Sequence, residues 1–262
     1  MRNAILLLIS IVALGFSYAQ ERPSFIHEQC DHFTVDIQDN LYLWKDAALN
    51  KYGPDGQLLF SYLSHDSGNI DNVDASIPSK ILVFYKDAGE INILDNTLSP
   101  VGNALSLFDH NLFSITLVAF AGANRIALFD NNTHQLILTD FSLNILSTTP
   151  VNFGDQFNPT RIEVALDKSI VLIDTTYGLF FFDNFGSYEK KTPLPHVISA
   201  QWQGSQLYYL KEDGLYKYDI PALDFILVTK DVQNARDFRR TYKNLYILGP
   251  DGEVQRQPIA RR

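Results

Sequence analysis

Residues 162–192 read IEVALDKSIVLIDTTYGLFFFDNFGSYEKKT, and this stretch decides the fold class. It contains four short runs, at Ile162–Leu166, Ile170–Asp174, Gly178–Asp183 and Tyr188–Thr192, separated by Asp, Lys, Ser, Thr, Gly and Asn. Short runs rich in Ile, Val, Phe and Tyr that are bounded by turn-forming residues are typical of β-strands. No window of helical length in the chain shows a sustained three-to-four spacing of apolar residues. The stretch therefore predicts one unit of four strands.

The same pattern recurs about every 40 residues along the chain. Its most regular element, a run of four or five mostly apolar residues, begins at positions 41, 81, 126, 170, 207 and 245. Successive copies are therefore 40, 45, 44, 37 and 38 residues apart. A period of this size marks a repeat architecture, and four-stranded units of this length that repeat radially describe a β-propeller. The sequence thus predicts an all-β protein.

The predicted strands of the other complete units follow the same order. The first unit has Phe33–Asp36, Leu41–Lys45, Leu49–Tyr52 and Leu58–Tyr62. The second has Asn72–Ser76, Ile81–Tyr85, Ile91–Leu94 and Ala104–Phe108. The third has Ile115–Phe120, Ile126–Phe129, Gln135–Asp140 and Ile145–Thr149. The fifth has Ile198–Trp202, Leu207–Lys211, Gly214–Asp219 and Phe225–Thr229.

The last unit is one strand short. It offers Ala235–Arg239, Leu245–Leu248 and Glu253–Gln257 before the sequence ends at Arg262. We predict that Ser24–Glu28 supplies the missing outer strand, because an open edge would leave unpaired backbone groups exposed to other chains. The prediction is six blades of about four strands closed by the N-terminal strand, and the alternative is five blades with irregular ends.

An aspartate closes the third strand in most units. The residues concerned are Asp95, Asp140, Asp183 and Asp219. An aspartate side chain can accept bonds from backbone N–H groups two residues further on, so these residues are expected to stabilise hairpin turns. The alternative, a ring of metal ligands, would require side chains that the predicted units hold far apart.

The chain resembles the β-propeller superfamily, nearest to the quinoprotein-like, YVTN and NHL types. The resemblance covers residues 22 to 260 and rests on copies such as Asn40-Leu-Tyr-Leu-Trp44 and Gly214-Leu-Tyr-Lys-Tyr218-Asp. The Gly-His and Trp-Asp signatures of WD40 repeats are absent, and so are the paired tryptophan motifs of quinoprotein dehydrogenases. More narrowly, Asp74-Ala-Ser-Ile-Pro-Ser-Lys-Ile-Leu-Val-Phe-Tyr-Lys-Asp87 looks like an uncharacterised family of exported Bacteroidetes propellers. That family implies no particular activity.

The N-terminus is typical of a secretory signal peptide. Arg2 precedes an apolar run from Ala4 to Phe16, and Ser17-Tyr18-Ala19 has the small-x-small pattern of a cleavage site. The run is too short for a membrane span, which needs about 20 apolar residues. We therefore expect residues 1–19 to be removed and residues 20–262 to form a single propeller domain in the periplasm or outside the cell. The one cysteine, Cys30, excludes an internal disulfide and lacks the preceding pattern of a lipoprotein.

Composition narrows the possible partners. Hydrophobic residues make up 46% of the chain, which is enough for a packed core. The formal net charge of −9 argues against nucleic acid and against an anionic membrane surface, because both attract basic proteins. The partners expected are other exported or outer-membrane proteins, with no stable membrane insertion. The oligomeric state is left open by the sequence.

No catalytic motif is present in the sequence. It has no HExxH motif, no Gly-rich phosphate loop and no Gly-x-Ser-x-Gly elbow, and its six histidines are scattered. We assign no catalytic residue, no metal ligand and no cofactor. Residues expected on the innermost strands or their connecting loops are candidates for binding in the channel or on a face: His32, Asp71, Asp74, Arg161, His196 and Arg236.

Two classes of function follow from this sequence. The first is an exported, non-enzymatic scaffold that binds proteins at the bacterial cell envelope. The alternative is a hydrolase or ligand binder that uses the propeller channel, such as a metal-dependent lactonase-like enzyme. The aromatic runs Phe180–Phe182 and Tyr208–Tyr209 could stack on sugars, but at strand spacing they are expected to pack between blades.

The signal peptide gives the first prediction. When the full chain is expressed in a Gram-negative host, the exported protein should begin at Gln20, because cleavage is expected after Ala19. Intact-mass measurement of the periplasmic fraction checks this. Full-length protein that still carries residues 1–19 in the membrane fraction would contradict the assignment.

Overall fold

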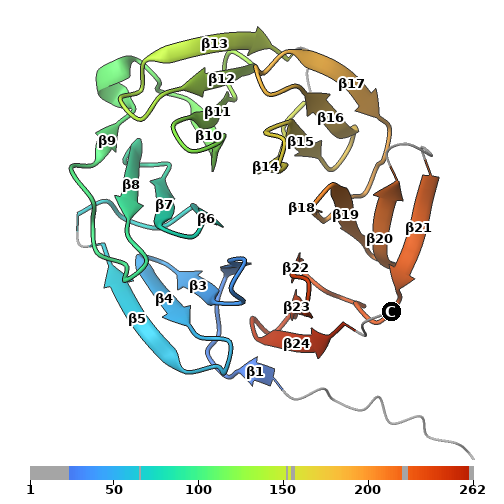
Figure 1. The fold of residues 1–262 in the computed structure, drawn as a ribbon. Coiled ribbons are helices and arrows are strands. Elements are labelled where there is room, and N and C mark those ends of the chain that lie inside the picture. Colours follow the sequence, from blue (N-terminus) through green and yellow to red (C-terminus); the bar gives the residue numbers. More distant parts are fainter. Residues whose placement is uncertain (1–23, 65, 152, 155–156, 220–223, 260–262) are drawn as a thin grey trace, which may run out of the picture.

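The computed structural model is a closed ring of six β-sheets (Figure 1). It describes residues 24–64, 66–151, 153–154, 157–219 and 224–259, so the predicted signal peptide lies outside the described residues. Each sheet has four antiparallel strands, and the described part of the chain adds one short 3₁₀ helix, Phe108–His110. The structure is the six-bladed β-propeller that the repeat predicts, and the five-bladed alternative is wrong.

Each blade uses four strands, ordered from the channel outward. Blade 1 contains β2 (His32–Val35), β3 (Leu41–Lys45), β4 (Ala48–Tyr52) and β5 (Leu58–Leu63). Blade 2 contains β6 (Asn72–Ile77), β7 (Lys80–Tyr85), β8 (Glu90–Leu94) and β9 (Leu105–Ser106). Blade 3 contains β10 (Ile115–Phe120), β11 (Ile126–Asp130), β12 (Gln135–Thr139) and β13 (Ile145–Pro150).

The other three blades repeat the arrangement. Blade 4 contains β14 (Arg161–Val164), β15 (Ile170–Asp174), β16 (Gly178–Phe182) and β17 (Tyr188–Thr192). Blade 5 contains β18 (Ser199–Gln203), β19 (Gln206–Lys211), β20 (Gly214–Asp219) and β21 (Asp224–Thr229). Blade 6 contains β22 (Asp237–Arg240), β23 (Asn244–Leu248), β24 (Val254–Pro258) and, as its outer strand, β1 (Ser24–Ile26).

Hydrophobic packing joins each blade to its neighbours. The second strands are buried along nearly their whole length, as β15 and β7 show. Buried residues form six clusters, and each cluster combines side chains from two adjacent blades. Phe180 and Tyr209, from the aromatic runs noted above, lie in two of these clusters. The aromatic runs are therefore inter-blade core, as predicted, because large side chains at alternate strand positions fill the wedge between neighbouring sheets.

Hairpin turns close as the aspartate pattern predicts. The Oδ1 atom of Asp183 accepts bonds from the backbone N–H groups of Phe185 and Ser187, both at 2.8 Å. Asp140 binds the backbone of Ser142 and Asn144 in the same way, at 2.8 and 3.0 Å. The turn after Asp219 falls on residues 220–223, outside the described residues.

One predicted strand is much shorter than expected. The outer strand of blade 2 was expected over Ala104–Phe108, but β9 spans only Leu105–Ser106. Leu107 turns inward and is buried in the cluster between blades 2 and 3. Its carbonyl then accepts a bond from the N–H of His110, which begins the 3₁₀ turn. Burial of Leu107 therefore ends the strand, because the backbone turn that points this side chain into the core cannot also continue pairing with β8.

The N-terminal strand closes the ring as predicted. In β1, Ser24 pairs with Gln255 and Ile26 pairs with Val254 of β24. Ile26 is buried in the cluster that joins blade 6 to blade 1. Further along the chain, the N–H of Cys30 donates to the carbonyl of Gly252 at 2.9 Å. Strand pairing and apolar burial thus act together at this seam.

The seam gives the second prediction. Ile26→Ala should lower the free energy of unfolding by about 2–4 kcal/mol, because it removes a buried aliphatic group from the cluster that closes the ring. Leu166→Ala is the matched control, because Leu166 is exposed and should change stability by less than about 0.5 kcal/mol. Urea denaturation followed by tryptophan fluorescence measures both. Equal effects of the two substitutions would contradict closure through β1.

Candidate functional site

The innermost strand of each blade alternates between the core and the central channel. Strand register aligns the six blades, because equivalent residues pair with equivalent positions of the second strand. One layer of channel-facing positions comprises His32, Asn72, Leu117, Arg161, Ser199 and Asp237. The next comprises Thr34, Asp74, Ala119, Glu163, Gln201 and Arg239. All of these except Ser199 line a cavity of about 790 Å³.

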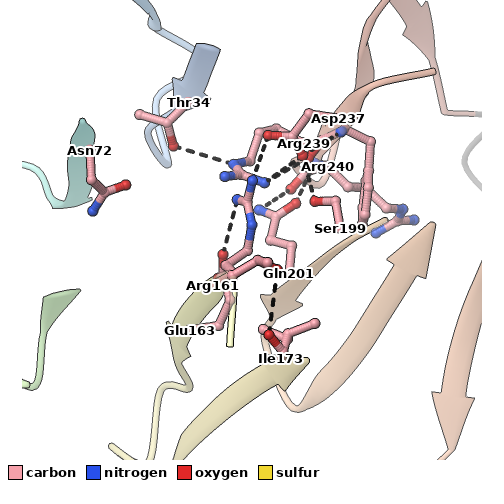
Figure 2. Close-up of polar contacts among 12 residues, drawn as sticks. Thr34, Asn72, Arg161, Glu163, Ile173, Ser199, Gln201, Asp237, Arg239 and Arg240 are labelled. Carbon is pink, nitrogen blue, oxygen red and sulfur yellow. Dashed lines mark hydrogen bonds and ion pairs between the residues drawn. The ribbon is translucent and has the colours of Figure 1, made fainter. Parts of the chain in front are cut away.

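A buried carboxylate links three blades at this channel (Figure 2). Asp237 of blade 6 is 6% exposed, and its Oδ2 atom accepts a bond from Arg161 Nη2 of blade 4 at 2.7 Å. Its Oδ1 atom accepts the hydroxyl of Ser199 from blade 5 at 2.5 Å and lies 3.2 Å from Arg239 Nη1. We call Arg161, Ser199, Asp237 and Arg239 the Asp237 network. Two guanidinium groups therefore compensate one buried carboxylate.

Other channel-facing side chains bind the backbone of the next blade. Gln201 of blade 5 accepts the N–H of Arg240 at 2.6 Å and donates to the carbonyl of the same residue at 3.1 Å. Asn72 of blade 2 donates to the carbonyl of Val118 in blade 3 at 2.8 Å. Much of the channel's polar chemistry is thus used to hold neighbouring blades together.

Two acidic side chains in the channel have pKa values above their usual range. Burial raises the pKa of Glu163 to about 8, although Arg161 Nη1 lies 3.5 Å from its Oε1 atom and acts in the opposite direction. Burial also raises the pKa of Asp74, whose oxygens accept the backbone N–H groups of Ser76 and Phe120 at 2.8 Å each. Burial of Glu163 therefore favours the protonated form of its carboxyl group.

The residues singled out from the sequence separate into two groups. His32, Asp71, Asp74 and Arg161 line the cavity, and the His32 ring stacks on Trp44 at 5.5 Å. His196 and Arg236 do not line it. The structure therefore brings four of the six residues together, without assigning them a function.

The two residues outside the cavity have positions that explain their absence from it. His196 is an exposed turn residue with φ of 65°, and its N–H donates to the carbonyl of Thr175. Arg236 Nη2 donates to the carbonyl of Asp31 at 3.2 Å, across the seam between blades 6 and 1. Within the described ranges, no group of three His, Cys, Asp or Glu side chains could hold a metal ion.

Several channel residues were not singled out from the sequence. They are Glu163, Ser199, Gln201, Gln203, Asp237 and Arg239. A signal for them is present, since polar residues alternate with apolar ones in Arg161-x-Glu163, Ser199-x-Gln201-x-Gln203 and Asp237-x-Arg239. This period of two places every second side chain of a strand on the same face.

Exposed apolar side chains surround one mouth of the cavity. Ile37, Leu166 and Tyr242 stand in the turns between first and second strands of blades 1, 4 and 6, and they are 72%, 72% and 75% exposed. All three line the cavity, and we call them the mouth triad. The corresponding turns of blades 3 and 5 carry Gly122 and Gly204, both at positive φ. At the cavity mouth, three turns therefore present an apolar side chain and two others present a glycine.

Comparisons with known proteins identify the fold. Comparison of the sequence with protein-family models and with curated proteins gives no match. Virginiamycin B lyase from Staphylococcus aureus is similar in structure, with a TM-score of 0.60 at 10% identity over 93% of this chain and 87% of that chain. A protein of unknown function from Bacteroides caccae has a TM-score of 0.59 at 10% identity, over 81% and 86% of the two chains.

PorZ from Porphyromonas gingivalis, described as a bacterial surface component of the type-IX secretion system, has a TM-score of 0.55 at 13% identity. The similarity covers 91% of this chain but only 34% of PorZ. Identities of this size establish a common fold and leave function open. In the part of the chain that the structure describes, no helix has the length and apolar character needed to cross a bilayer.

Glu163 gives the third prediction. Its pKa is about 8 in the folded state and near 4.5 when unfolded, so between these values the folded state binds more protons and stability falls as pH rises. Glu163→Gln should remove this slope, and the variant should gain stability relative to the parent protein between pH 5 and pH 9. The free energy of unfolding, measured by urea denaturation at pH 5 and at pH 9, checks this. Glu189→Gln on the exposed strand β17 is the control. Parallel pH profiles for parent and Glu163→Gln would contradict it.

Proposed function

We propose that this protein is an exported, non-enzymatic scaffold of the bacterial cell envelope that binds another exported or outer-membrane protein through the mouth triad. The observation that carries the proposal is the exposure of Ile37, Leu166 and Tyr242 around a single channel mouth. Exposed apolar residues that gather on one surface of a soluble protein mark interaction sites, whereas scattered ones need no explanation.

The chemistry of the rim suits a protein partner. Tyrosine is enriched among the residues that dominate binding energy, and apolar residues around a recess accommodate a protruding side chain. A propeller face is broad enough for the roughly 800 Å² per partner of a standard interface. The channel beneath is braced by the Asp237 network, so the rim stands on a rigid support and little ordering is required on binding.

The expected location supports the same proposal. The predicted signal peptide would deliver the chain to the periplasm or beyond, where envelope proteins are available as partners. The structural similarity to PorZ, a surface component of a secretion system, agrees with such a setting by analogy of fold. The negative charge of the chain favours protein partners over nucleic acid or anionic lipid.

The fourth prediction tests the mouth triad. A photo-crosslinking amino acid at position 242 should capture one reproducible protein in the native envelope, identified by mass spectrometry. Combined Ile37→Asp and Leu166→Asp in that background should reduce capture about tenfold or more, since two apolar contacts are replaced by charges. The matched control is Leu58→Asp and Leu63→Asp on exposed β5, which should leave capture unchanged. Equal capture in both pairs, with thermal stability preserved, would overturn the proposal.

A second candidate function is favoured by one specific observation. Both carboxamide atoms of Gln203 are buried in the cavity wall and have no hydrogen-bond partner among the described residues. Such groups can be satisfied by a small molecule in the channel, which is the ligand-binding or hydrolase alternative. Assays of the purified protein with lactones and small esters, with and without added divalent metal, separate the two functions. Metal-dependent turnover that Glu163→Gln abolishes would favour the enzyme over the scaffold.

A further inference from the structure

The outer strand of blade 5 presents an exposed apolar edge. In β21, Phe225, Ile226, Leu227 and Val228 are consecutive and each is between 40% and 44% exposed. The strand ends its sheet, and no further described strand pairs with it; it lies on the outer rim of the ring (Figure 1). Exposed apolar edges invite pairing with another strand unless charges or other devices protect them.

Three of the other outer strands show such protection. In β17 the corresponding strand carries Glu189, Lys190 and Lys191, and in blade 2 the outer strand β9 is only two residues long. In blade 6 the outer strand is β1, which has three residues. The outer strand β5 of blade 1 is, like β21, six residues long, apolar and exposed. What distinguishes β21 is the pair of opposite charges at its two ends.

The charges that flank β21 are complementary to those of a second copy. The segment runs Asp224-Phe-Ile-Leu-Val-Thr-Lys230, with an acid at one end and an exposed base at the other. In an antiparallel pair centred on Leu227, Asp224 of each copy stands opposite Lys230 of the other. Between these two ion pairs Ile226 then stands opposite Val228 and Leu227 opposite Leu227, while Phe225 stands opposite Thr229.

We propose that β21 pairs antiparallel with β21 of a second copy of this chain, which joins two propellers edge to edge. Within one copy, Asp224 stands directly opposite Asp219 across β20 and β21. A lysine contributed by the second copy places an opposite charge beside Asp224. The dimer therefore gains from charge at both ends and from apolar contact between them.

The pairing is expected to be weak and concentration-dependent. The register of β21 shifts at Val228, and this bulge limits the length of regular strand that a partner can follow. A contact confined to one short strand edge buries less than about 1,200 Å², which is the lower limit for standard stable interfaces. Because both ion pairs are exposed to solvent, raising the ionic strength to about 1 M should weaken the dimer.

Charge reversal tests the proposal on the purified mature chain. Sedimentation equilibrium should show a monomer–dimer equilibrium for the parent protein. Asp224→Lys and Lys230→Asp should each weaken association about tenfold or more, because each places like charges at both ends of the pair. An equimolar mixture of the two variants should restore dimers, since each variant then meets the opposite charge. Circular dichroism establishes that both variants remain folded.

The matched control lies on the other apolar outer strand. Phe60→Lys in β5 introduces a charge at a comparably exposed position and should leave the dimer intact. A parent protein that stays monomeric throughout the concentration range would overturn the proposal. So would a dimer that resists both charge reversals, that is not restored by mixing, or that is lost with Phe60→Lys.

Discussion

The carboxylate of Asp237 is the interaction on which the channel depends. It accepts bonds from Arg161 of blade 4 and Ser199 of blade 5, and it pairs with Arg239 of its own strand. Arg239 in turn reaches Thr34 of blade 1 at 3.4 Å. A buried carboxylate is costly unless its partners are complete, so removing one partner leaves an uncompensated charge. The network therefore fixes the relative positions of four blades at the hub.

A ring made from one chain also needs its first and last blades joined. Contacts between blades 6 and 1 occur at several distances from the propeller axis. At the hub side, the buried carboxylate of Asp39 accepts the hydroxyls of Thr241 and Tyr246 at 2.6 and 3.2 Å. Farther out, β1 completes the sheet of blade 6, and the guanidinium of Arg256 stacks on Phe25, 3.8 Å from its ring centre. The other seams are joined by inter-blade packing and side-chain hydrogen bonds, whereas this one adds a strand from the opposite end of the chain.

The blades could be predicted well from the sequence because the same pattern of strands and turns recurs in six units. Some predicted strand ends differ from the structure by one or two residues, because the backbone hydrogen bonds that begin each turn cannot be read from the sequence. The failure at β9 comes from Leu107, whose burial depends on the neighbouring blade. The channel was harder, since its residues come from six units and converge only after the ring closes. His196 and Arg236 were expected on the innermost strands or their loops but do not line the cavity, whereas the strand register identifies Glu163, Asp237 and Arg239 as channel residues.

The turns at the channel mouth break the symmetry of the ring. Six equivalent turns would offer a docking protein six equivalent rotational settings about the propeller axis. Here three turns carry Ile37, Leu166 and Tyr242, while two others carry Gly122 and Gly204 at the cavity. Their order around the axis, in blades 1, 4 and 6 against 3 and 5, does not repeat under any rotation of the ring. The face therefore has no rotational symmetry about the propeller axis. A protein that contacts all three apolar side chains can dock there in one orientation about that axis.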